Sequence, residues 1–530
     1  MFLIMSAAYI SQELESEFGT IPPAFLPLGN KRLFQHQVNS APKGKRVFLT
    51  VPESYTINNF DRNWLHQRNV TILAIPDNIS LGASLISALN LVGHNLDEPL
   101  SILFGDTLIP ELPSGEDIVA ISEVENSYNW AVVTHDETEL LKTNQIRSEL
   151  DSANVVSGYF KCSQPKVLIK ALIQAHWDFN GGMNLYHAQV GLTTVRIDNW
   201  LDFGHVNTYY RSKAKYTTQR AFNELTITPR WIEKSSCKSI KIQAEAHWFK
   251  QLPPMMRTFT PQFLGATHDK NAESCAYRLE YLHHTALNEL YVFSALPDMV
   301  WRRIINGCLH FIDECLLHPA PSQRPVSNLA SLFTEKTQSR LTQYCKAQQL
   351  DPEAKWQYNQ SLTLSLTELN QLSQNYLPKA QHLSSVMHGD FCFSNILYDF
   401  RTNSIKTIDP RGLNQQQELT IFGDVRYDLA KLSHSIIGLY DWIIAGYFNL
   451  TLNEHMIDFE LLQPKELKAT QQFFMIQVEQ KYGLTRAEIY AMQIQLFLSM
   501  LPLHSDDKNR QNALLANAFR LYQLLAEENS

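Results

Sequence analysis

Short apolar runs alternate with amphipathic stretches along roughly the first 210 residues of the chain. The apolar runs have the length of strands, whereas residues 81–91 repeat their apolar positions at the spacing of a helix. Strands that alternate with helices predict an α/β domain with a mostly parallel sheet. The expected strands are residues 2–5, 47–51, 70–75, 100–104, 118–121 and 130–133.

The pattern changes in the next part of the chain. A β pair is expected over residues 222–228 and 231–234, followed by a helix over residues 240–252. From about residue 300 the pattern turns helical, and the clearest amphipathic helices are expected at residues 329–333, 362–372 and 514–525.

A chain of 530 residues is too long for a single hydrophobic core. Together with the change of pattern, this length predicts an α/β domain over residues 1–212 and an α+β domain over residues 213–530. We expect the second domain to have a small lobe up to about residue 285 and a large lobe from about residue 286.

No stretch of the sequence is typical of a membrane span. Residues 1–8 are apolar but lack a basic leader, and they run directly into an acidic stretch, so we expect a first strand and not a signal peptide. The longest later apolar run, residues 436–450, contains Asp441 and follows His434. It is too short and too polar to cross a bilayer, and a buried helix is expected there.

Composition and charge narrow the choice of partners. A net charge of −8 argues against a protein built mainly to grip nucleic acid, and small molecules are the better expectation. The seven cysteines are scattered without C-x-x-C spacing, which predicts neither a disulfide framework nor a zinc site and fits a reducing cytoplasm. The oligomeric state stays open.

The most informative stretch runs from His388-Gly389-Asp390 to Asn395 and, after a short hairpin, to Asp409. Apolar runs that are typical of strands flank these polar residues, and loop spacing lets the side chains point into one cleft. Phosphoryl transfer uses this set of groups, in which an Asp accepts a hydroxyl proton and an Asn and a second Asp hold Mg²⁺. The alternative is that Asp and Asn only cap turns between strands.

The pattern H-G-D-x-x-x-x-N followed by I-D resembles the aminoglycoside phosphotransferase and choline kinase family. The resemblance implies a protein-kinase-like α+β domain that uses ATP and Mg²⁺. It also implies that Asp390 is the catalytic base in a loop shared with His388, and that Asn395 and Asp409 are the metal ligands.

A kinase small lobe needs a strand lysine that reaches the phosphates and a helix glutamate that holds this lysine. Lys234 and Glu245 are the natural pair, although Lys238 and Lys241 compete for the role of the lysine. The run that contains Glu280 resembles the strand and hinge that hold the adenine, and its candidate contacts are Glu280 and Tyr281.

Other residues of the second domain have two interpretations. Arg411 follows the metal Asp and could bind an anionic substrate group bidentately, or it could pair with Asp424. Asp428, in a G-D-x-x-Y-D-L-A stretch that resembles the family's, is expected to brace the lobe by hydrogen bonds. A box for a quaternary ammonium group, or core packing, is possible for Tyr440, Trp442, Tyr447 and Phe448. An acceptor pocket, or a solvated surface, is possible for His504, Asp506 and Asp507.

In the first domain, Asp106 closes an apolar run and Asp202 lies in a W-x-D-x-G segment. Ligands of α/β sheets bind at the carboxyl ends of the strands, and two carboxylates there would hold a hard cation such as Mg²⁺. Each Asp alone could instead cap a turn or a helix.

The order of G-D, Gly158-Tyr159-Phe160 and W-x-D-x-G resembles the sugar-phosphate nucleotidyltransferase family, whose α/β fold is Rossmann-like. The resemblance implies that Asp106 and Asp202 are metal ligands, that Gly82 begins the helix that contacts the base, and that a nucleoside triphosphate, CTP or UTP, is the co-substrate.

The front loop departs from the pattern of that family. The family has a glycine-rich loop and a Pro-Lys pair, but residues 6–13 contain no glycine and Pro23 stands in the place of the lysine. Backbone amides approach a triphosphate less closely without glycine, and a missing cation leaves charge less stabilised. Lys31 and Arg32, further along, could restore that charge.

Taken together, these resemblances imply a bifunctional enzyme. A kinase would phosphorylate a sugar, polyol or amino alcohol, and a nucleotidyltransferase would activate the phosphomonoester as a precursor of bacterial surface polysaccharide such as capsule. The alternative is an active kinase with a catalytically dead front domain that binds or regulates.

Overall fold

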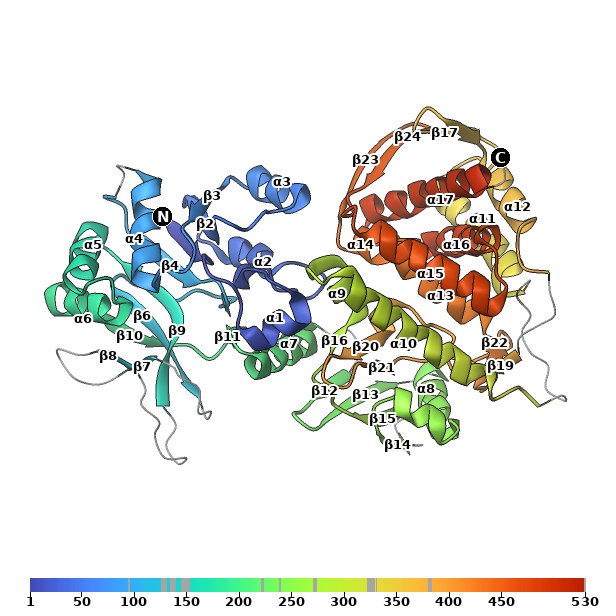
Figure 1. Ribbon diagram of the computed structural model, residues 1–530, viewed down its shortest axis with the longest axis horizontal. Coiled ribbons are helices and arrows are strands. Elements are labelled where there is room, and N and C mark those ends of the chain that lie inside the picture. The colour runs from blue at the N-terminus through green and yellow to red at the C-terminus, as the bar shows by residue number, and fades with distance from the viewer. Residues whose placement is uncertain are drawn as a thin grey trace. The chain divides into compact units, whose positions relative to one another are not determined.

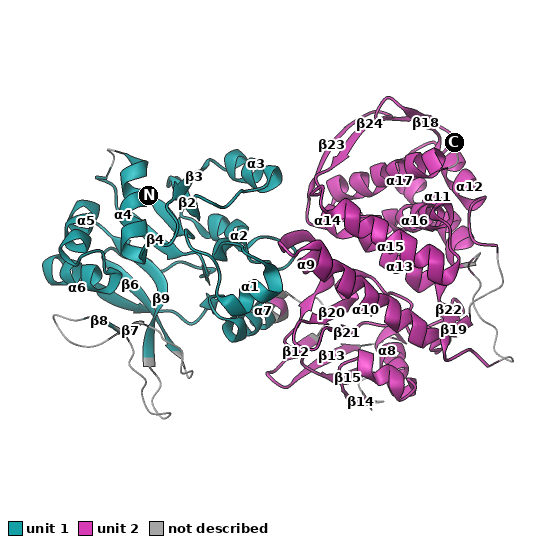
Figure 2. Cartoon of the chain, in the orientation of Figure 1, with its two compact units in different colours: residues 1–216 teal, residues 217–530 magenta. Residues whose placement is uncertain are grey.

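The computed structural model describes residues 1–93, 96–124, 131–133, 140–143, 153–220, 224–237, 240–269, 274–321, 329, 331–379 and 384–528. The chain divides into two compact units, Met1–Tyr216 and Thr217–Ser530 (Figure 2). The division falls within helix α7 (Val206–Arg220), slightly later than the boundary expected from the sequence.

Unit 1 is an α/β domain built on a sheet in the strand order β10-β6-β9-β4-β1-β2-β3, with β7 and β8 off this path (Figure 1). Its strands are β1 (Phe2–Met5), β2 (Val47–Pro52), β3 (Val70–Ile75), β4 (Leu100–Phe104), β5 (Thr107–Leu108), β6 (Ile118–Val124), β7 (Ala131–Val133), β8 (Leu141–Thr143), β9 (Ala153–Cys162), β10 (Thr193–Arg196) and β11 (Leu201–Asp202). Its other helices are α1 (Gln12–Phe18), η1 (Pro23–Phe25), α2 (Leu33–Ser40), α3 (Asn59–Gln67), α4 (Leu81–Val92), α5 (Pro165–Gln174) and α6 (Phe179–Val190).

The predicted strands and the helix over residues 81–91 are present, and along its main strand order the sheet is mostly parallel as expected, with β9 as its one antiparallel strand among the described residues. Strands β4, β1, β2 and β3 run parallel, whereas β9 is antiparallel to both β4 and β6. Parallel neighbours need a long crossover, usually a helix, and no helix is described between β6 and β9. Position 130, the start of one expected strand, lies outside the described residues.

Helices α4, α5 and α6 pack together over one apolar core of unit 1. This core includes Leu85, Leu89, Phe160 and Leu172, all essentially without exposed surface. Helix α4 begins where the Ser80 hydroxyl accepts the backbone N–H of Ala83, an N-cap that satisfies one of the helix's free donors.

Unit 2 begins with a small antiparallel sheet in the order β12-β13-β15-β14, with helix α8 against it (Figure 1). The predicted β pair and the following helix are confirmed, and Ile242, Ala246 and Phe249 of this helix are buried. The elements of this lobe are β12 (Glu224–Ile227), β13 (Trp231–Cys237), α8 (Ile240–Gln251), η2 (Met255–Phe259), β14 (Phe263–Asp269) and β15 (Ser274–Glu280).

The rest of unit 2 is mainly helical, with short strand pairs inserted. Its helices are α9 (Leu287–Phe293), α10 (Asp298–Leu316), η3 (Ser331–Glu335), α11 (Lys336–Gln348), α12 (Leu366–Gln374), η4 (Phe393–Asn395), α13 (Arg426–Ile436), α14 (Tyr440–Ile444), α15 (Leu467–Tyr482), α16 (Arg486–Met500), η5 (Leu501–His504) and α17 (Lys508–Glu528). Its strands are β16 (Thr285–Ala286), β17 (Trp356–Tyr358), β18 (Leu362–Leu364), β19 (Ser384–Val386), β20 (Ile396–Asp399), β21 (Ser404–Thr407), β22 (Phe422–Asp424), β23 (Phe448–Asn453) and β24 (Met456–Leu461).

Two local predictions for this lobe were wrong. The apolar run 436–450 is not one helix, because it spans the end of α13, all of α14 and the start of β23. Leu439, with a φ of 55°, turns the chain between the two helices, and Gly446, with a φ of 85°, turns it again before β23. Residues 362–364 form the strand β18, and only then does α12 begin, capped by Ser365 and Glu368.

No helix within the described residues is long and apolar enough to span a membrane.

Gly82 is expected to be essential for the packing of α4 in unit 1. A Cβ at this position would lie 2.4 Å from the backbone oxygen of Trp177, which has little room to move. Alanine favours a helix by up to about 1 kcal/mol over glycine, but overpacking costs about 1–3 kcal/mol. We therefore expect Gly82→Ala to lower the free energy of unfolding in chemical denaturation of the full chain.

Gly307→Ala in α10 is the matched control for this variant. The nearest atom to a Cβ there is a side-chain methyl of Ile405 at 3.4 Å, an ordinary contact. The control should be as stable as the parent or slightly more stable, and equal stability of the two variants would contradict the close approach at Gly82.

Candidate active sites

The loop between β19 and β20 brings the predicted kinase residues together. The side-chain amide of Asn395 donates to the backbone oxygen of Asp390 at 2.9 Å and to its carboxylate at 3.1 Å. The backbone N–H of Ile408 donates to the carbonyl of Asn395, which places Asp409 beside the same loop. Because the Asn395 nitrogen faces Asp390, its oxygen points elsewhere, where it accepts a hydrogen bond from the Ser394 hydroxyl at 3.4 Å and has a second lone pair for a cation.

His388 lies behind this loop and holds it from within. Its ring is fully buried, and its Nδ1 accepts the backbone N–H of Asp390 at 3.3 Å, so Nε2 carries the proton and donates to the carbonyl of Ile408 at 2.9 Å. Burial lowers the pKa of His388 to about 4, and the ring is therefore neutral at pH 7. The side chain thus links the two segments that carry Asp390 and Asp409.

Asp428 at the start of α13 braces the same loop, as the sequence predicted. Its two carboxylate oxygens accept the backbone N–H groups of His388 at 2.6 Å and of Gly389 at 2.8 Å. Burial raises the pKa of Asp428 to about 7, against the opposing effect of these two donors. Gly389 itself has a φ of 82°, a backbone conformation that favours glycine.

Asp390 is paired with Lys431, which lies one helical turn beyond Asp428 and was assigned no role from the sequence. The Lys431 ammonium lies 2.8 Å from the Asp390 carboxylate, whose side chain remains 42% exposed. Desolvation alone would raise the pKa of Asp390, but Lys431 holds it at about 2. Asp390 is therefore fully ionised at neutral pH.

Lys234 and Glu245 meet, and Lys234 also reaches the metal-ligand candidate Asp409. The Lys234 ammonium lies 2.5 Å from the Asp409 carboxylate and 3.5 Å from that of Glu245. Glu245 is completely buried and accepts the Tyr277 hydroxyl at 2.6 Å. Burial alone would lower the pKa of Lys234, but the two carboxylates hold it above its usual value. Of its competitors, Lys241 is 3.7 Å from Glu245, and Lys238 lies outside the described residues.

A cavity of about 660 Å³ opens onto Asp390, Asn395 and Asp409. Its wall is formed by side chains from α8, α11, α13, α14, α16 and η5, all within unit 2. The charged side chains that line it are Lys241, Lys336, Arg340, Asp390, Asp409, Arg411 and Lys431.

Sequence reasoning missed Lys336, Arg340 and Lys431 as lining residues. Lys336 and Arg340 are four residues apart at the start of α11, and this spacing puts them on one face of the helix. That spacing was the signal available in the sequence. Which face would meet the Asp390 loop depended on tertiary packing, which the local pattern does not contain.

Arg411 does not form the ion pair with Asp424 that was one of its two interpretations. Asp424 pairs with Arg426, whose guanidinium nitrogens lie 2.6 and 2.9 Å from it. Within the described part of the chain, no carboxylate lies at ion-pair distance from Arg411, which lines the cavity. The predicted adenine contacts Glu280 and Tyr281 do not line this cavity: Glu280 is exposed, and the Tyr281 ring packs against His283.

The aromatic group near α14 belongs to the core. Trp442 and Tyr447 are buried against each other and against the rings of Tyr291 and Phe293. Tyr440 alone of the four candidates lines the cavity, next to His504. Asp506, exposed and paired with Arg510, does not line it.

In unit 1, the antiparallel pair of β5 and β11 brings Asp106 and Asp202 together. Asp202 lies opposite Thr107 in this pair, and the backbone N–H of Phe203 donates to the carbonyl of Asp106 at 2.8 Å. Gly204 keeps the space open, because a Cβ there would lie 2.7 Å from an Asp106 carboxylate oxygen. Both carboxylates line a cavity of about 360 Å³.

The two carboxylates repel each other in this cavity. Burial and then the neighbouring charge of Asp106 raise the pKa of Asp202 to about 7, and burial raises that of Asp106. One carboxylate oxygen of Asp202 is buried and has no hydrogen-bond partner among the described residues. These features fit a hard cation such as Mg²⁺. No cluster of three or more His, Cys, Asp or Glu side chains suited to a metal occurs within the described residues, so a cation here would take its other ligands from phosphate or water.

The remaining predicted residues of unit 1 do not reach this cavity. Gly82 packs against the backbone of Trp177, and its neighbour Leu81 lines the cavity instead. Lys31 is exposed in a turn and is not among the residues that line the cavity. Arg32 is buried, with its guanidinium 3.3 Å from Asp61, and so is committed to the packing of the domain.

No protein family model matches the chain, and no curated protein matches it. Among solved structures, a nucleoside-diphosphate-sugar pyrophosphorylase from Vibrio cholerae is 14% identical, with a TM-score of 0.33, over 40% of this chain and 99% of that one. CTP:phosphocholine cytidylyltransferase from Streptococcus pneumoniae is also 14% identical, with a TM-score of 0.31, over 40% and 96%. An aminoglycoside-3′-phosphotransferase of type VIII is 12% identical, with a TM-score of 0.32, over 55% and 99%. Both families named from the motifs thus occur among the similar structures, and function has to be inferred from the side chains.

Asp428 is expected to stabilise unit 2 through its two backbone hydrogen bonds. Asp428→Asn keeps one acceptor oxygen but turns an N–H₂ group toward the second backbone donor. Leaving a buried donor unsatisfied costs about 1–3 kcal/mol. Because burial raises the pKa of both Asp428 and Asp441, an amide at either position also removes a charge that opposes folding at pH 7. We therefore expect the free energy of unfolding of Asp428→Asn at pH 7 to be lower than that of Asp441→Asn by about this amount.

Asp441→Asn is the control, because this carboxylate is also buried but one of its oxygens has no partner within the described residues. Burial raises the pKa of Asp441 from 3.8 to about 6. Its ionisation therefore opposes folding as the pH rises through this interval. The free energy of unfolding of the control should equal that of the parent near pH 4. The difference in favour of the control should grow up to about pH 6 and stay constant at higher pH. A similar loss in both variants would mean that the backbone bonds to Asp428 are not the cause.

Proposed function

We propose that this chain is a bifunctional transferase. Unit 2 would be an ATP-dependent kinase that phosphorylates a small hydroxyl compound, and unit 1 would transfer a nucleotidyl group from CTP or UTP to the phosphomonoester. The observation that carries the proposal is that Asp390, Asn395 and Asp409 line one cavity, while Lys234, far away in the sequence, forms an ion pair with Asp409.

In the kinase step, Asp390 would accept the proton of the acceptor hydroxyl while the oxygen–phosphorus bond forms and ADP leaves. A carboxylate with a pKa near 2 is a weak base, so Asp390 would mainly orient the hydroxyl and take its proton late, as bond formation acidifies it. Lys431 would hold the carboxylate in place. His388, buried and hydrogen-bonded to the backbone, would act as a positioning residue and not as a catalytic one.

Asn395 and Asp409 would hold Mg²⁺, and Lys234 would bind phosphate oxygens. Bound Mg²⁺ supplies charge neutralisation to the phosphates in transfers of this kind. The ion pair between Lys234 and Asp409 supports this assignment, because it puts a cation where a phosphate and its counter-ion would meet. Glu245, held by Tyr277, would keep Lys234 directed at that position. The adenine contacts proposed for Glu280 and Tyr281 rest on the sequence alone.

Unit 1 is proposed to be active because of Asp106 and Asp202. Their mutual repulsion and the unpartnered oxygen of Asp202 favour a bound cation, which would bring the triphosphate and the phosphomonoester to one place. A kinase and a nucleotidyltransferase in one chain would carry out successive steps toward a nucleotide-activated building block. Both steps would take place in the cytoplasm. Their product would be a precursor of bacterial surface polysaccharide.

A second candidate is that unit 1 only binds or regulates. The observation in its favour is that no Lys or Arg occurs among the described residues that line its cavity, and that Lys31 and Arg32 do not supply the missing charge. Gly82 likewise serves packing in the structure. A triphosphate would then depend on the metal alone for neutralisation.

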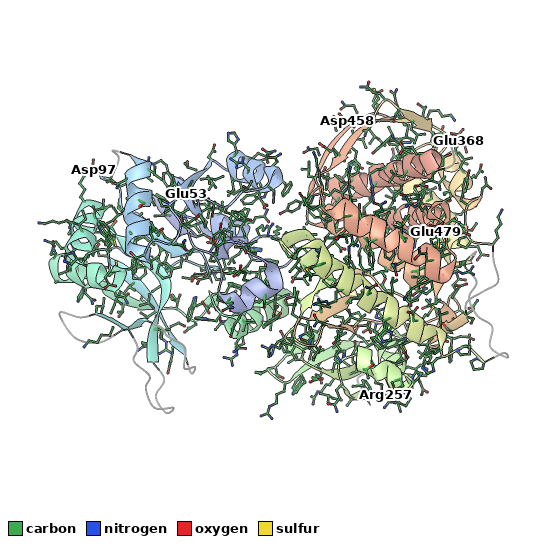
Figure 3. The ribbon with its side chains drawn as sticks, in the orientation of Figure 1. Glu53, Asp97, Arg257, Glu368, Asp458 and Glu479 are labelled. Carbon is green, nitrogen blue, oxygen red and sulfur yellow. The ribbon has the colours of Figure 1, made fainter. Side chains whose placement is uncertain are left out.

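Asp390→Asn tests the kinase. The change keeps the size of the side chain and its bond to Asn395 but removes the proton acceptor, so ATP-dependent phosphorylation should fall by about 10²–10⁴-fold. ADP formation with a panel of hydroxyl compounds measures this loss. Asp458→Asn, exposed on β24 (Figure 3), is the control and should keep full activity. Near-normal turnover by Asp390→Asn would contradict the assignment of Asp390 as the base.

Asp106→Ala and Asp202→Ala test unit 1. Each removes a metal ligand, so pyrophosphate release from CTP or UTP with the kinase product should be abolished, while phosphorylation of the acceptor continues and the phosphomonoester accumulates. The control, Asp97→Ala, changes an exposed carboxylate of the same unit (Figure 3). If the parent releases no pyrophosphate with any common triphosphate while its kinase is active, unit 1 binds or regulates and does not catalyse.

A further inference from the structure

The cavity of unit 2 carries more positive charge than its proposed reaction with ATP requires. Its carboxylates, Asp390 and Asp409, are already paired with Lys431 and Lys234. Lys336, Arg340 and Arg411 line the same cavity in addition.

These three cations are not neutralised by carboxylates. Within the described residues of unit 2, no Asp or Glu lies at ion-pair distance from any of them. Residues 322–328, which precede α11 and are not described, contain no Asp or Glu in the sequence. The polar contacts of the two α11 side chains are neutral: Lys336 donates to the Tyr427 hydroxyl at 3.2 Å, and Arg340 donates to the Ser499 carbonyl at 3.0 Å.

The charges also act on one another. Burial, and then repulsion from Arg411, lower the pKa values of Lys336 and Arg340, with Tyr427 opposing the shift. Burial alone would raise the pKa of the completely buried Tyr427, but Lys336, Lys431 and Arg411 lower it below its usual value. An anion bound among these groups would relieve their repulsion.

The position of the cluster favours the acceptor over the nucleotide. The nucleotide phosphates would lie at Lys234, Asn395 and Asp409, next to the small lobe. Lys336 and Arg340 come from α11 of the large lobe, and they share the cavity wall with α13 and α16, beside the proposed base Asp390. A hydroxyl held at Asp390 would leave the rest of its molecule against this wall.

We propose that the phosphate acceptor of unit 2 is itself an anion, a hydroxyl compound that carries a carboxylate or a phosphate ester bound by Lys336, Arg340 and Arg411. The proposal rests on the proposed kinase function and narrows its substrate class. A guanidinium such as that of Arg340 or Arg411 binds carboxylate or phosphate through two parallel hydrogen bonds. Amino alcohols and amino sugars are disfavoured, because their ammonium group would face these cations.

The first test measures anion binding without turnover. The full chain is saturated with Mg²⁺ and a non-hydrolysable ATP analogue, and its melting temperature is compared in inorganic phosphate and in chloride at equal ionic strength. We expect phosphate to raise the melting temperature of the parent and to have no such effect on the double variant Lys336→Met with Arg340→Gln. Lys346→Met, exposed on the same helix and outside the cavity, is the control and should behave as the parent.

The second test measures ADP formation with matched acceptors, namely glucose, glucuronate, glucose 6-phosphate and glucosamine, and glycerol, glycerate, glycerol phosphate and ethanolamine. We expect an anionic member to have at least a tenfold higher kcat/KM than its neutral and cationic counterparts. The double variant should raise KM for that acceptor at least tenfold and leave KM for ATP unchanged. Comparison of the carboxylates with the phosphate esters identifies which oxyanion is bound.

The outcomes separate this proposal from the kinase itself. Equal or better use of a neutral or cationic acceptor, or a phosphate effect that is absent in the parent or persists in the double variant, overturns the anionic acceptor and leaves the kinase intact. ATP turnover that is insensitive to Asp390→Asn overturns the kinase function. If no acceptor in the panel is used, the phosphate measurement alone decides whether the wall binds an anion.

Discussion

Carboxylates that are partly or completely removed from water are the constraint on which both sites depend. An ionised carboxyl group away from water needs N–H donors, a cation or a proton. Unit 2 provides the first two, because backbone N–H groups satisfy Asp428 while Lys431 and Lys234 pair with Asp390 and Asp409. The loop from His388 to Asn395 has its shape because these partners hold it from several sides.

The same constraint is left partly unmet in unit 1. Asp106 and Asp202 face each other, and within the described residues no lysine or arginine lines their cavity. Burial, and then the charge of Asp106, raise the pKa of Asp202 to about 7, so a proton kept on the pair relieves the repulsion near neutral pH. A divalent cation would satisfy both groups at once.

Site residues that lie close together along the chain could be grouped from the sequence, whereas residues that only the packing of distant helices brings together could not. Asp390, Asn395 and Asp409 could be grouped from the sequence because two short loops and one hairpin connect them, and Lys234 and Glu245 because a strand and the next helix carry them. Lys336 and Arg340 could not, since α11 packs against α16 and η5, which lie far along the chain, and only that packing brings the two side chains to the wall of the cavity that Asp390 also lines. Local turns also made one prediction from the apolar pattern wrong. The run 436–450 is apolar throughout most of its length, yet turns at Leu439 and Gly446 divide it into separate elements. Near the N-terminus, the position of Lys31 in the sequence suggested that its positive charge acts at the cavity of unit 1. In the structure its side chain is exposed and does not line that cavity.

The two cavities consequently differ in the balance of their fixed charges. In unit 2 the cations outnumber the carboxylates, so an anionic acceptor could bind there with no metal beyond the one proposed for the nucleotide. In unit 1 the described lining contains carboxylates and no lysine or arginine, so a triphosphate and a phosphomonoester would both be repelled until a cation is bound. If the acceptor is already an anion, its phosphomonoester carries still more negative charge. The second step would then depend on metal more steeply than the first, because only the metal would offset that charge in unit 1.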